Sequence, residues 1–345
     1  MCCSVMFSFF PKPYPDEILY SVFSRYHLRS GNRSAVQTMQ DLFNDPNHKA
    51  TVDLPCRLDV LALNLSPCSM HTVDSLLQNH TLYPFYTVFM PEEKLKQAQQ
   101  SWHFGNSHNS GWGAVLNRKR GGFLSRPGAA SNLIDTPAYF RFCPLCLKQD
   151  QQMYGEPYWH RLHQTPGVLV CPMHTVALQV SLVPTEMLSR NQRTYHAASL
   201  ENCPCDLPAP SYSVKVFEKL LQLATDVAQL MHQPLPCRGQ AWFVKQYAAL
   251  LFERGLGTTT IPKYEELVVQ FLSYYGQEFL SVLDSQISAD NDGWPFSIAL
   301  IPTESFHPVR HLLMSRFLSR PIEDIFLKDY KPLPFGKGPW LCLNV

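Results

Sequence analysis

Apolar residues recur at helical spacing over much of the chain. Near the N-terminus, the segment PYPDEILYSVFSRYHLRSGN places five apolar side chains on one helical face, namely Ile18, Leu19, Val22, Phe23 and Tyr26. An acidic start and a Gly31-Asn32 stop bound this helix. Shorter helical patterns follow at 34–43, 54–63 and 72–80. Such a series of short helices is typical of a helix-turn-helix domain, and equally of a small bundle that contacts no nucleic acid.

The C-terminal part of the chain shows the same periodicity. The segment YSVKVFEKLLQLATDVAQLMHQ carries apolar residues at helical spacing, namely Val216, Leu220, Leu223, Val227 and Leu230. Segments 242–258 and 261–283 predict two helices separated by a glycine turn. A further helix begins at Pro308, a residue suited to the first helical position. We therefore expect a second helical domain of helix-turn-helix type.

Two short motifs of metal-binding type interrupt the helical pattern in FCPLCLKQDQQMYGEPYWHRLHQTPGVLVCPMHT. Cys143 and Cys146 form the first, and Cys171 and His174 form the second after twenty-four residues. A two-residue gap lets both side chains of a pair turn onto one ion, and two pairs supply the four tetrahedral ligands of a structural zinc site. A proline occupies the same position in each pair. The spacing predicts bound Zn²⁺; the alternative is four ordinary buried side chains.

A closed set of three cysteines and one histidine leaves no coordination position for a reacting water molecule, so we expect the ion to hold the fold. The chain has no His-Glu-x-x-His helix, no Walker A loop, no Gly-x-Ser-x-Gly motif and no zinc-deaminase signature. The sequence therefore predicts a protein that is not an enzyme. Cys203 and Cys205 are half of a candidate second metal site with His196 or Cys237, or else a turn with two thiols.

The composition indicates a globular protein with no global basic field. The chain has 345 residues, of which 45% are hydrophobic and 17% charged, and its net charge is +1. Its apolar runs are shorter than the roughly 18–20 residues that span a bilayer, and the N-terminal segment lacks the charged start of a signal peptide. Eleven cysteines are an odd number, and four of them lie in metal-binding pairs. We expect a cytoplasmic protein without membrane contact.

One local segment is strongly basic. Between Lys94 and Ile134 no acidic residue occurs. The stretch NRKRGGFLSRPG within it carries four basic residues, namely Arg118, Lys119, Arg120 and Arg126. A loop of this kind is suited to neutralising phosphates, to docking a protein partner, or simply to being solvated.

These features predict a mainly α fold with a small zinc-ribbon module. We expect four parts, which are an N-terminal helix-turn-helix domain at 1–92, a basic connector at 93–138, a zinc-binding module at 139–208 and a C-terminal helical domain at 209–345.

Four blocks of the sequence together resemble the TniQ/TnsD family of transposon target-selection proteins. They are FPKPYPDEILYSVFSRYHLRSGN, HTLYPFYTVF, the zinc segment and HPVRHLLMSRFL with PFGKGPWLCLN. The zinc segment is the most specific, with Tyr154-Gly155-Glu156, Trp159, Arg161, His163-Gln164 and Pro166-Gly167. The resemblance implies an adaptor that connects target recognition to the AAA+ regulator TnsC. On matching positions it implies that the two metal-binding pairs ligate zinc and that the N-terminal helical region is the helix-turn-helix domain.

The resemblance leaves two branches open. Short members join a Cascade effector whose guide RNA reads the target by base pairing, whereas long members bind a fixed attachment site through added C-terminal domains. Here the motif GPWLCLNV ends the sequence, and Cys342 lacks the partner it has in long members. Either the chain is a short member or it is a cut long one; length favours the RNA-guided branch. Self-association into a dimer, an independent DNA-binding regulator and a zinc-containing nuclease are further alternatives.

Two residues between the metal-binding pairs are assigned different roles. We expect Trp159 to pack around the metal module. Arg161 is the better candidate for a partner contact, because arginine is favoured at interface hot spots and pairs with phosphate.

Overall fold

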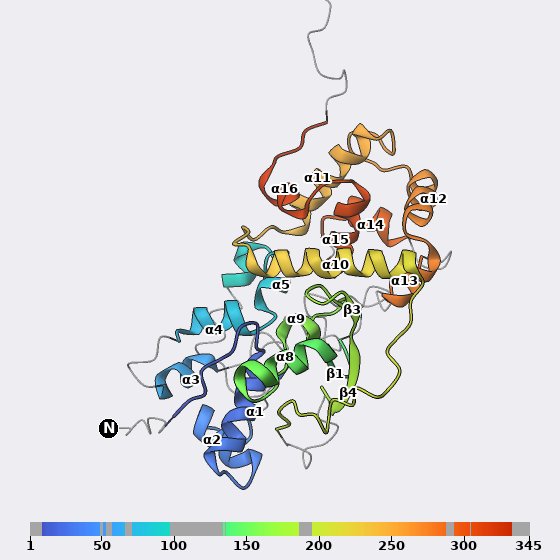
Figure 1. Cartoon of the computed structure of the whole chain (residues 1–345). Coiled ribbons are helices and arrows are strands. Elements are labelled where there is room, and N and C mark those ends of the chain that lie inside the picture. Colours follow the sequence, from blue (N-terminus) through green and yellow to red (C-terminus); the bar gives the residue numbers. More distant parts are fainter. Residues whose placement is uncertain are drawn as a thin grey trace, which may run out of the picture.

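The computed structural model describes most of the chain, namely residues 9–48, 51–52, 57–65, 71–96, 134, 136–185, 195–287, 293–303 and 305–332. It is mainly helical, as predicted. The long helix α10 (Val214–His232) crosses the middle of the molecule, with the N-terminal helices and the metal-binding module on one side and the C-terminal helices on the other (Figure 1).

The N-terminal part consists of short helices. They are α1 (Leu19–Ser30), α2 (Ala35–Phe43), α3 (Leu58–Asn64), α4 (Val73–His80) and α5 (Tyr83–Thr87). The apolar face predicted for α1 is buried, and Gly31 ends the helix in the left-handed conformation at φ +73°, which confirms both predictions. The prediction of an acidic first turn was wrong, because α1 begins at Leu19, after Asp16 and Glu17. The Asp16 carboxylate contacts Arg161, and the Glu17 carboxylate contacts Arg25 of α1.

The metal-binding module combines short strands and helices. They are β1 (Tyr139–Phe142), α8 (Pro144–Tyr154), α9 (Arg161–Gln164), β2 (Val170–Cys171), β3 (Val176–Ala177) and β4 (Gln179–Pro184). Strands β1 and β4 form one antiparallel pair and β2 and β3 another. Trp159 is buried and stacks on Phe140 at 4.6 Å between ring centroids, so its predicted packing role is confirmed.

The C-terminal part is helical. Its helices are α11 (Gln240–Glu253), α12 (Tyr264–Tyr275), α13 (Gln277–Val282), α14 (Trp294–Leu300), α15 (Pro308–Phe317) and α16 (Ile322–Leu327). Pro308 takes the predicted first position of α15. The single helix predicted over 261–283 is wrong, because Gly276 adopts φ +78° and ψ 150° and divides it into α12 and α13.

Helix α10 joins the halves of the molecule. Its predicted apolar face is buried, and it packs on α5, β2, α13, α15 and α16. A close approach accompanies this packing: a Cβ atom on Gly167, within the metal-binding module, would lie 2.7 Å from Cγ2 of Val309 in α15 and 3.7 Å from Cδ2 of Leu223 in α10. The buried apolar residues form one connected cluster. The boundaries of the four parts and the helix-turn-helix assignments therefore stay predictions.

Candidate metal centre and its support

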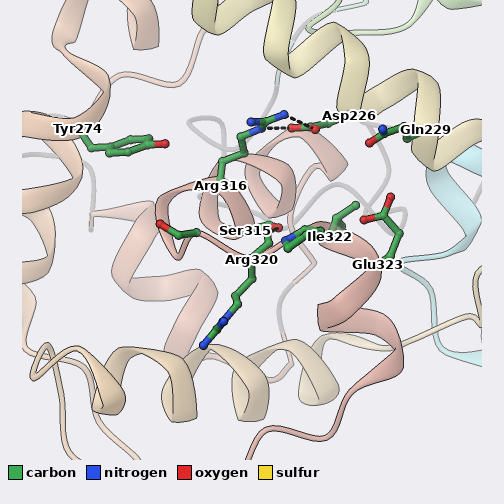
Figure 2. Close-up of a pocket in the computed structure, with 10 residues that line it drawn as sticks. Asp226, Gln229, Tyr274, Ser315, Arg316, Arg320, Ile322 and Glu323 are labelled. Carbon is green, nitrogen blue, oxygen red and sulfur yellow. Dashed lines mark hydrogen bonds and ion pairs between the residues drawn. The ribbon is translucent and has the colours of Figure 1, made fainter.

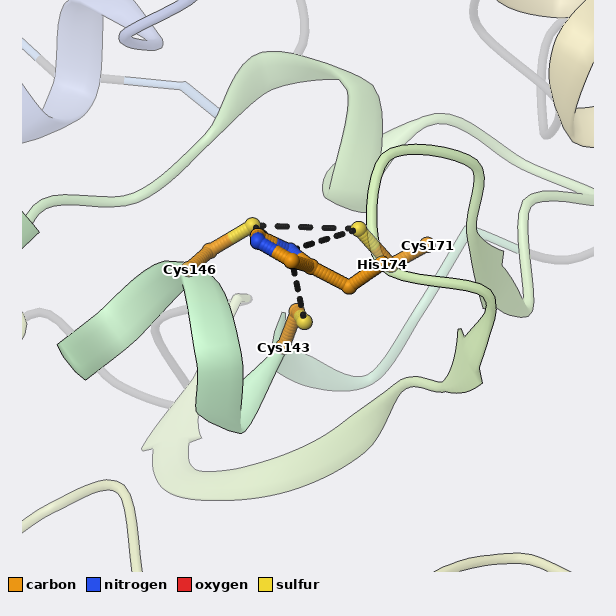
Figure 3. A group of neighbouring side chains, drawn as sticks. All are labelled: Cys143, Cys146, Cys171 and His174. Atoms are coloured by element: carbon orange, nitrogen blue, oxygen red, sulfur yellow. Dashed lines mark hydrogen bonds between the residues drawn. The ribbon is translucent and has the colours of Figure 1, made fainter. Parts of the chain in front are cut away.

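The four predicted ligands lie at the ends of neighbouring elements. Cys143 precedes α8 and Cys146 lies in the first turn of that helix, which begins at Pro144. Cys171 ends β2, and His174 lies in the turn that leads to β3. The local chain geometry thus brings Cys143 close to Cys146, and Cys171 close to His174. The position of α8 beside the β2–β3 turn then places the two pairs next to each other (Figure 3).

The distances between the ligand atoms fit one tetrahedral ion. Sγ of Cys146 lies 3.7 Å from Sγ of Cys171 and 3.2 Å from Nδ1 of His174. Nδ1 of His174 lies 3.6 Å from Sγ of Cys143 and 3.7 Å from Sγ of Cys171. Ligand atoms at zinc bond lengths on a tetrahedron are roughly 3.3–3.8 Å apart. All four atoms lie within 4.8 Å of one another, so the structure confirms that the predicted residues form a group able to hold a metal ion.

The donor set favours zinc over a hard cation, because thiolates and imidazole suit Zn²⁺ whereas Mg²⁺ and Ca²⁺ prefer oxygen ligands. The three cysteines are buried and no disulfide joins them. Four protein ligands around one ion leave no open position. The chemistry of such a site is structural: the ion would fix α8 to the β2–β3 turn.

Two further histidines lie beside the candidate metal site, of which His163 is buried and His160 half-buried. Nε2 of His163 lies 4.0 Å from Sγ of Cys146, and burial lowers the pKa of His163. The His163 ring packs against His160, whose Nε2 lies 2.8 Å from Oδ2 of Asp150 in α8. Burial acts to lower the pKa of His160, but the hydrogen bond and charge of Asp150 outweigh it and the pKa is raised. Sequence reasoning missed Asp150, because no ligand spacing marks it.

The structure does not bring a third ligand to the candidate second site. Cys203 is buried and Cys205 exposed. Within the described ranges, only the four residues around Cys146 form a group of three or more metal-binding side chains. Burial raises the pKa of the Cys203 thiol to about 12, which disfavours the thiolate that a metal needs. A second metal site therefore stays a prediction.

Arg161 does not have the exposed position expected for a partner contact. Its side chain is only 2% exposed. Its Nε donates to Oδ1 of Asp16 at 3.0 Å, and its Nη1 donates to the carbonyl oxygens of Gln78 and Thr81. The guanidinium thus ties the metal module to α4 and to the segment before α1. This corrects the prediction that Arg161 is exposed for a partner protein. Its guanidinium is buried because it bonds to Asp16 and to two backbone carbonyl groups of the same chain.

Backbone contacts complete this joint, which we define as the contact between residues 14–29 and residues 156–162. Ile18 N–H donates to the carbonyl of Trp159 at 3.0 Å, and Arg161 N–H donates to the carbonyl of Asp16. Glu17 and His160 form an isolated antiparallel bridge. The segment before α1 therefore lies along the metal module like an added short strand.

A cluster of charges lies at the centre of the joint. Arg25 donates from Nη1 to Glu17 at 2.8 Å and from Nε to Glu156 at 2.7 Å, and Arg29 also donates to Glu156. Glu17 is fully buried, and this burial raises its pKa to about 7 although Arg25 and two further donors oppose the rise. Glu156 belongs to the family-specific Tyr-Gly-Glu motif, so the structure gives that motif the role of holding α1 on the module.

The remaining contact residues predicted from the sequence are the basic ones, Arg118, Lys119, Arg120 and Arg126. They lie outside the described residues, as does most of the 93–138 connector. Their role stays a prediction. None of the helices that the structure describes is both long and apolar enough to cross a membrane.

Taken together, these observations define a mainly helical protein in which three cysteines and a histidine form a group able to hold a metal ion. The TniQ family model matches residues 8–178, and the model described as Tn7-like transposition protein D matches residues 223–345. The chain belongs to the TniQ/TnsD family of transposition proteins.

A curated relative agrees with this assignment. The chain is 24% identical over 310 residues to the transposon Tn7 transposition protein TnsD of Escherichia coli. The alignment covers 88% of this chain and 56% of the relative, so the chain spans little more than half of that protein. The resemblance noted from the sequence motifs is thereby confirmed.

Proposed function

We propose that this chain is a non-catalytic target-selection adaptor of a transposon, which links a target-recognition complex to the AAA+ regulator TnsC. The joint between residues 14–29 and 156–162 carries the proposal. It fixes the N-terminal helices to the metal module through Arg161 and the Glu17–Arg25–Glu156 cluster. An adaptor must hold two partners in one fixed relation, and a buried joint held by side-chain and backbone hydrogen bonds supports such rigidity.

This proposal has two forms. In the RNA-guided form, the target-recognition complex is a Cascade effector with its guide RNA. The adaptor then needs no base-reading surface of its own, since base pairing supplies the sequence information. The second candidate is an attachment-site-directed protein of the TnsD type, which binds its DNA site itself. The match of residues 223–345 to the Tn7-like transposition protein D favours this candidate.

Reconstitution tests the adaptor role. Zinc-loaded protein is mixed with TnsC and ATP, and separately with Cascade and guide RNA, and each mixture is analysed by size-exclusion chromatography. We expect co-elution with TnsC and no ATP, DNA or RNA turnover by the chain alone. If the zinc-loaded chain forms a complex with neither TnsC nor Cascade, the proposal is wrong. Metal-dependent DNA cleavage by the chain alone would instead revive the nuclease reading.

The basic segment gives a test of direct DNA contact. The triple variant Arg118→Ala, Lys119→Ala, Arg120→Ala should bind duplex DNA more weakly and reduce the salt slope by about three if each side chain neutralises one phosphate. A control variant removes three exposed lysines of the C-terminal helices, Lys215, Lys245 and Lys263. An equal slope in the wild type and the first variant would exclude phosphate contact by this segment.

A further inference from the structure

Three arginines that are at least partly shielded from solvent pair with carboxylates of the same chain. In the polar cleft among α10, α12, α15 and α16, Arg316 donates two hydrogen bonds to Asp226 (Figure 2). Arg25 and Arg161 of the joint have carboxylate partners as well. An ionised group that leaves water without such a partner costs free energy. Arg141 in β1 is a buried arginine that differs from these three.

The guanidinium of Arg141 has donors to spare. The residue is only 8% exposed, and its Nη2 donates to the carbonyl oxygen of Thr165 at 2.9 Å. Its Nε is buried without a hydrogen bond, whereas Nη1, which also forms none, is not fully enclosed. Within the described residues, Arg141 forms no ion pair with a carboxylate. A positive charge is therefore left uncompensated, with one donor group that solvent can reach.

This arginine lies beside an exposed apolar surface of the sheet. In the pairing of β1 with β4, Arg141 is opposite Val180 and Tyr139 is opposite Pro184, and opposite residues point to the same face of a sheet. Alternate residues of β4 are exposed on that face. Tyr139 is 47%, Val180 50% and Leu182 62% exposed. We call Tyr139, Val180, Leu182 and Pro184 the β1–β4 face.

The edges of this strand pair are occupied next to the face. On the outer side of β4, the N–H group of Leu182 donates to the carbonyl oxygen of Asn202 at 2.9 Å. On the outer side of β1, the N–H group of Arg141 donates to Oε1 of Gln164, and Nε2 of Gln164 donates back to the Arg141 carbonyl oxygen. A partner therefore cannot add a strand at these positions and must bind through side chains on the face.

We propose that the β1–β4 face binds an acidic segment of a partner protein. Apolar side chains of the segment cover Tyr139, Val180 and Leu182, and one carboxylate accepts a hydrogen bond from Nη1 of Arg141 and compensates its charge. A nucleic-acid backbone fits less well, because its phosphates would leave the apolar side chains without apolar contact. The inference rests on this surface alone and is independent of the adaptor proposal.

Methyl NMR of the zinc-loaded full chain tests the proposal, with the methyl groups of Val180 and Leu182 as reporters. The probe is the capped tripeptide N-acetyl-Leu-Glu-Leu methylamide, and the controls carry Gln or Lys in the central position. We expect saturable shifts of both residues with the Glu probe, and about tenfold weaker binding of the Gln probe. No saturable shift up to 20 mM of the Glu probe, or equal binding of the Glu and Gln probes, would overturn the proposal.

Two variants separate the apolar contact from the charge. Leu182→Ser should weaken binding of the Glu probe about fivefold without a change in melting, because the side chain is exposed. The matched control is Leu327→Ser, which removes an equally exposed leucine of α16 and should leave binding unchanged. Equal binding of the Glu probe by the two leucine variants would contradict a site on the β1–β4 face.

Arg141→Met is judged by the ratio of its affinities for the Glu and Gln probes, because loss of the hydrogen bond to Thr165 can also change the fold around it. We expect the tenfold ratio to fall to about one. A ratio that stays at the wild-type value would overturn the role of Arg141, and Leu182→Ser decides the site if Arg141→Met does not fold. Shifts of the two reporters on concentrating the free protein, with no response to the Glu probe, would assign the face to a second copy of this chain instead.

Discussion

Replacing Arg161 with methionine removes the guanidinium from the joint but keeps an apolar stem of similar length. In the wild type this group is 2% exposed and donates to Asp16 and to the carbonyl oxygens of Gln78 and Thr81. The variant leaves Asp16, which is 22% exposed, without its guanidinium. It also leaves both carbonyl groups without this donor.

The expected cost follows from these contacts. Loss of one partner of a fully buried ion pair costs about 3–5 kcal/mol, and the partial exposure of Asp16 reduces this to about 2 kcal/mol. Each carbonyl group that loses its donor adds about 1 kcal/mol. The free energy of unfolding should therefore fall by about 4 kcal/mol. With an unfolding entropy of about 0.7 kcal/mol/K for a chain of this length, the melting temperature should fall by about 5–6 °C.

Urea unfolding followed by tryptophan fluorescence measures this loss, and a chromogenic chelator measures bound zinc in parallel. The control is Arg33→Met, which removes an exposed arginine and should change stability by less than about 0.5 kcal/mol. Zinc should remain at wild-type stoichiometry in both variants, since Arg161 is no ligand. If Arg161→Met is as stable as Arg33→Met but no longer binds a partner protein, Arg161 is a contact residue and the joint has been misinterpreted.

Three further predictions concern the metal centre, the charge cluster and the packing on α10. Cys146→Ser should lose its zinc and unfold the module, whereas Cys205→Ser should keep one zinc per chain; two zinc ions in the wild type and one in Cys205→Ser would establish a second site. Since burial raises the pKa of Glu17 from 4.5 to about 7, the folded chain holds a proton there that the unfolded chain has released. The contribution of Glu17 to the free energy of unfolding is therefore present below pH 4.5 and is lost, by about 3 kcal/mol, as the pH rises to 7 and above. Glu17→Gln should flatten this decline of stability with pH in urea titrations. An equally steep decline in the variant would exclude the raised pKa of Glu17. Gly167→Ala should cost about 2–3 kcal/mol in thermal unfolding without zinc loss, because its φ of +82° and the nearby Val309 both oppose a Cβ atom; wild-type melting would refute this close approach.

The sequence predicted those features that depend on neighbours along the chain. The apolar faces of α1 and α10 follow from a period of 3.6 residues, and both are buried as expected. The four residues of the candidate metal site were predicted because a two-residue gap is a local geometric requirement for two side chains to bind one ion. The same local reasoning placed Pro308 at the start of α15.

Features that depend on distant segments were not predictable in this way. Asp16 and Glu17 have the pattern of a helix start, yet their carboxylates bind Arg161 and Arg25 instead. For Asp16 the partner is distant in the sequence, and this ion pair outweighs the weak preference of acids for a helix N-terminus. Arg161 was misplaced for the same reason.

The central claim is that this chain adapts target recognition to TnsC. The most direct measurement is a pull-down of the tagged chain from cells that express the rest of its transposon genes, with and without the guide RNA. The account predicts recovery of TnsC in both conditions and of Cascade subunits only with the guide. Recovery of TnsC alone, unaffected by the guide, would replace the RNA-guided form with the attachment-site form. Recovery of neither partner by the zinc-loaded chain would contradict the adaptor function itself.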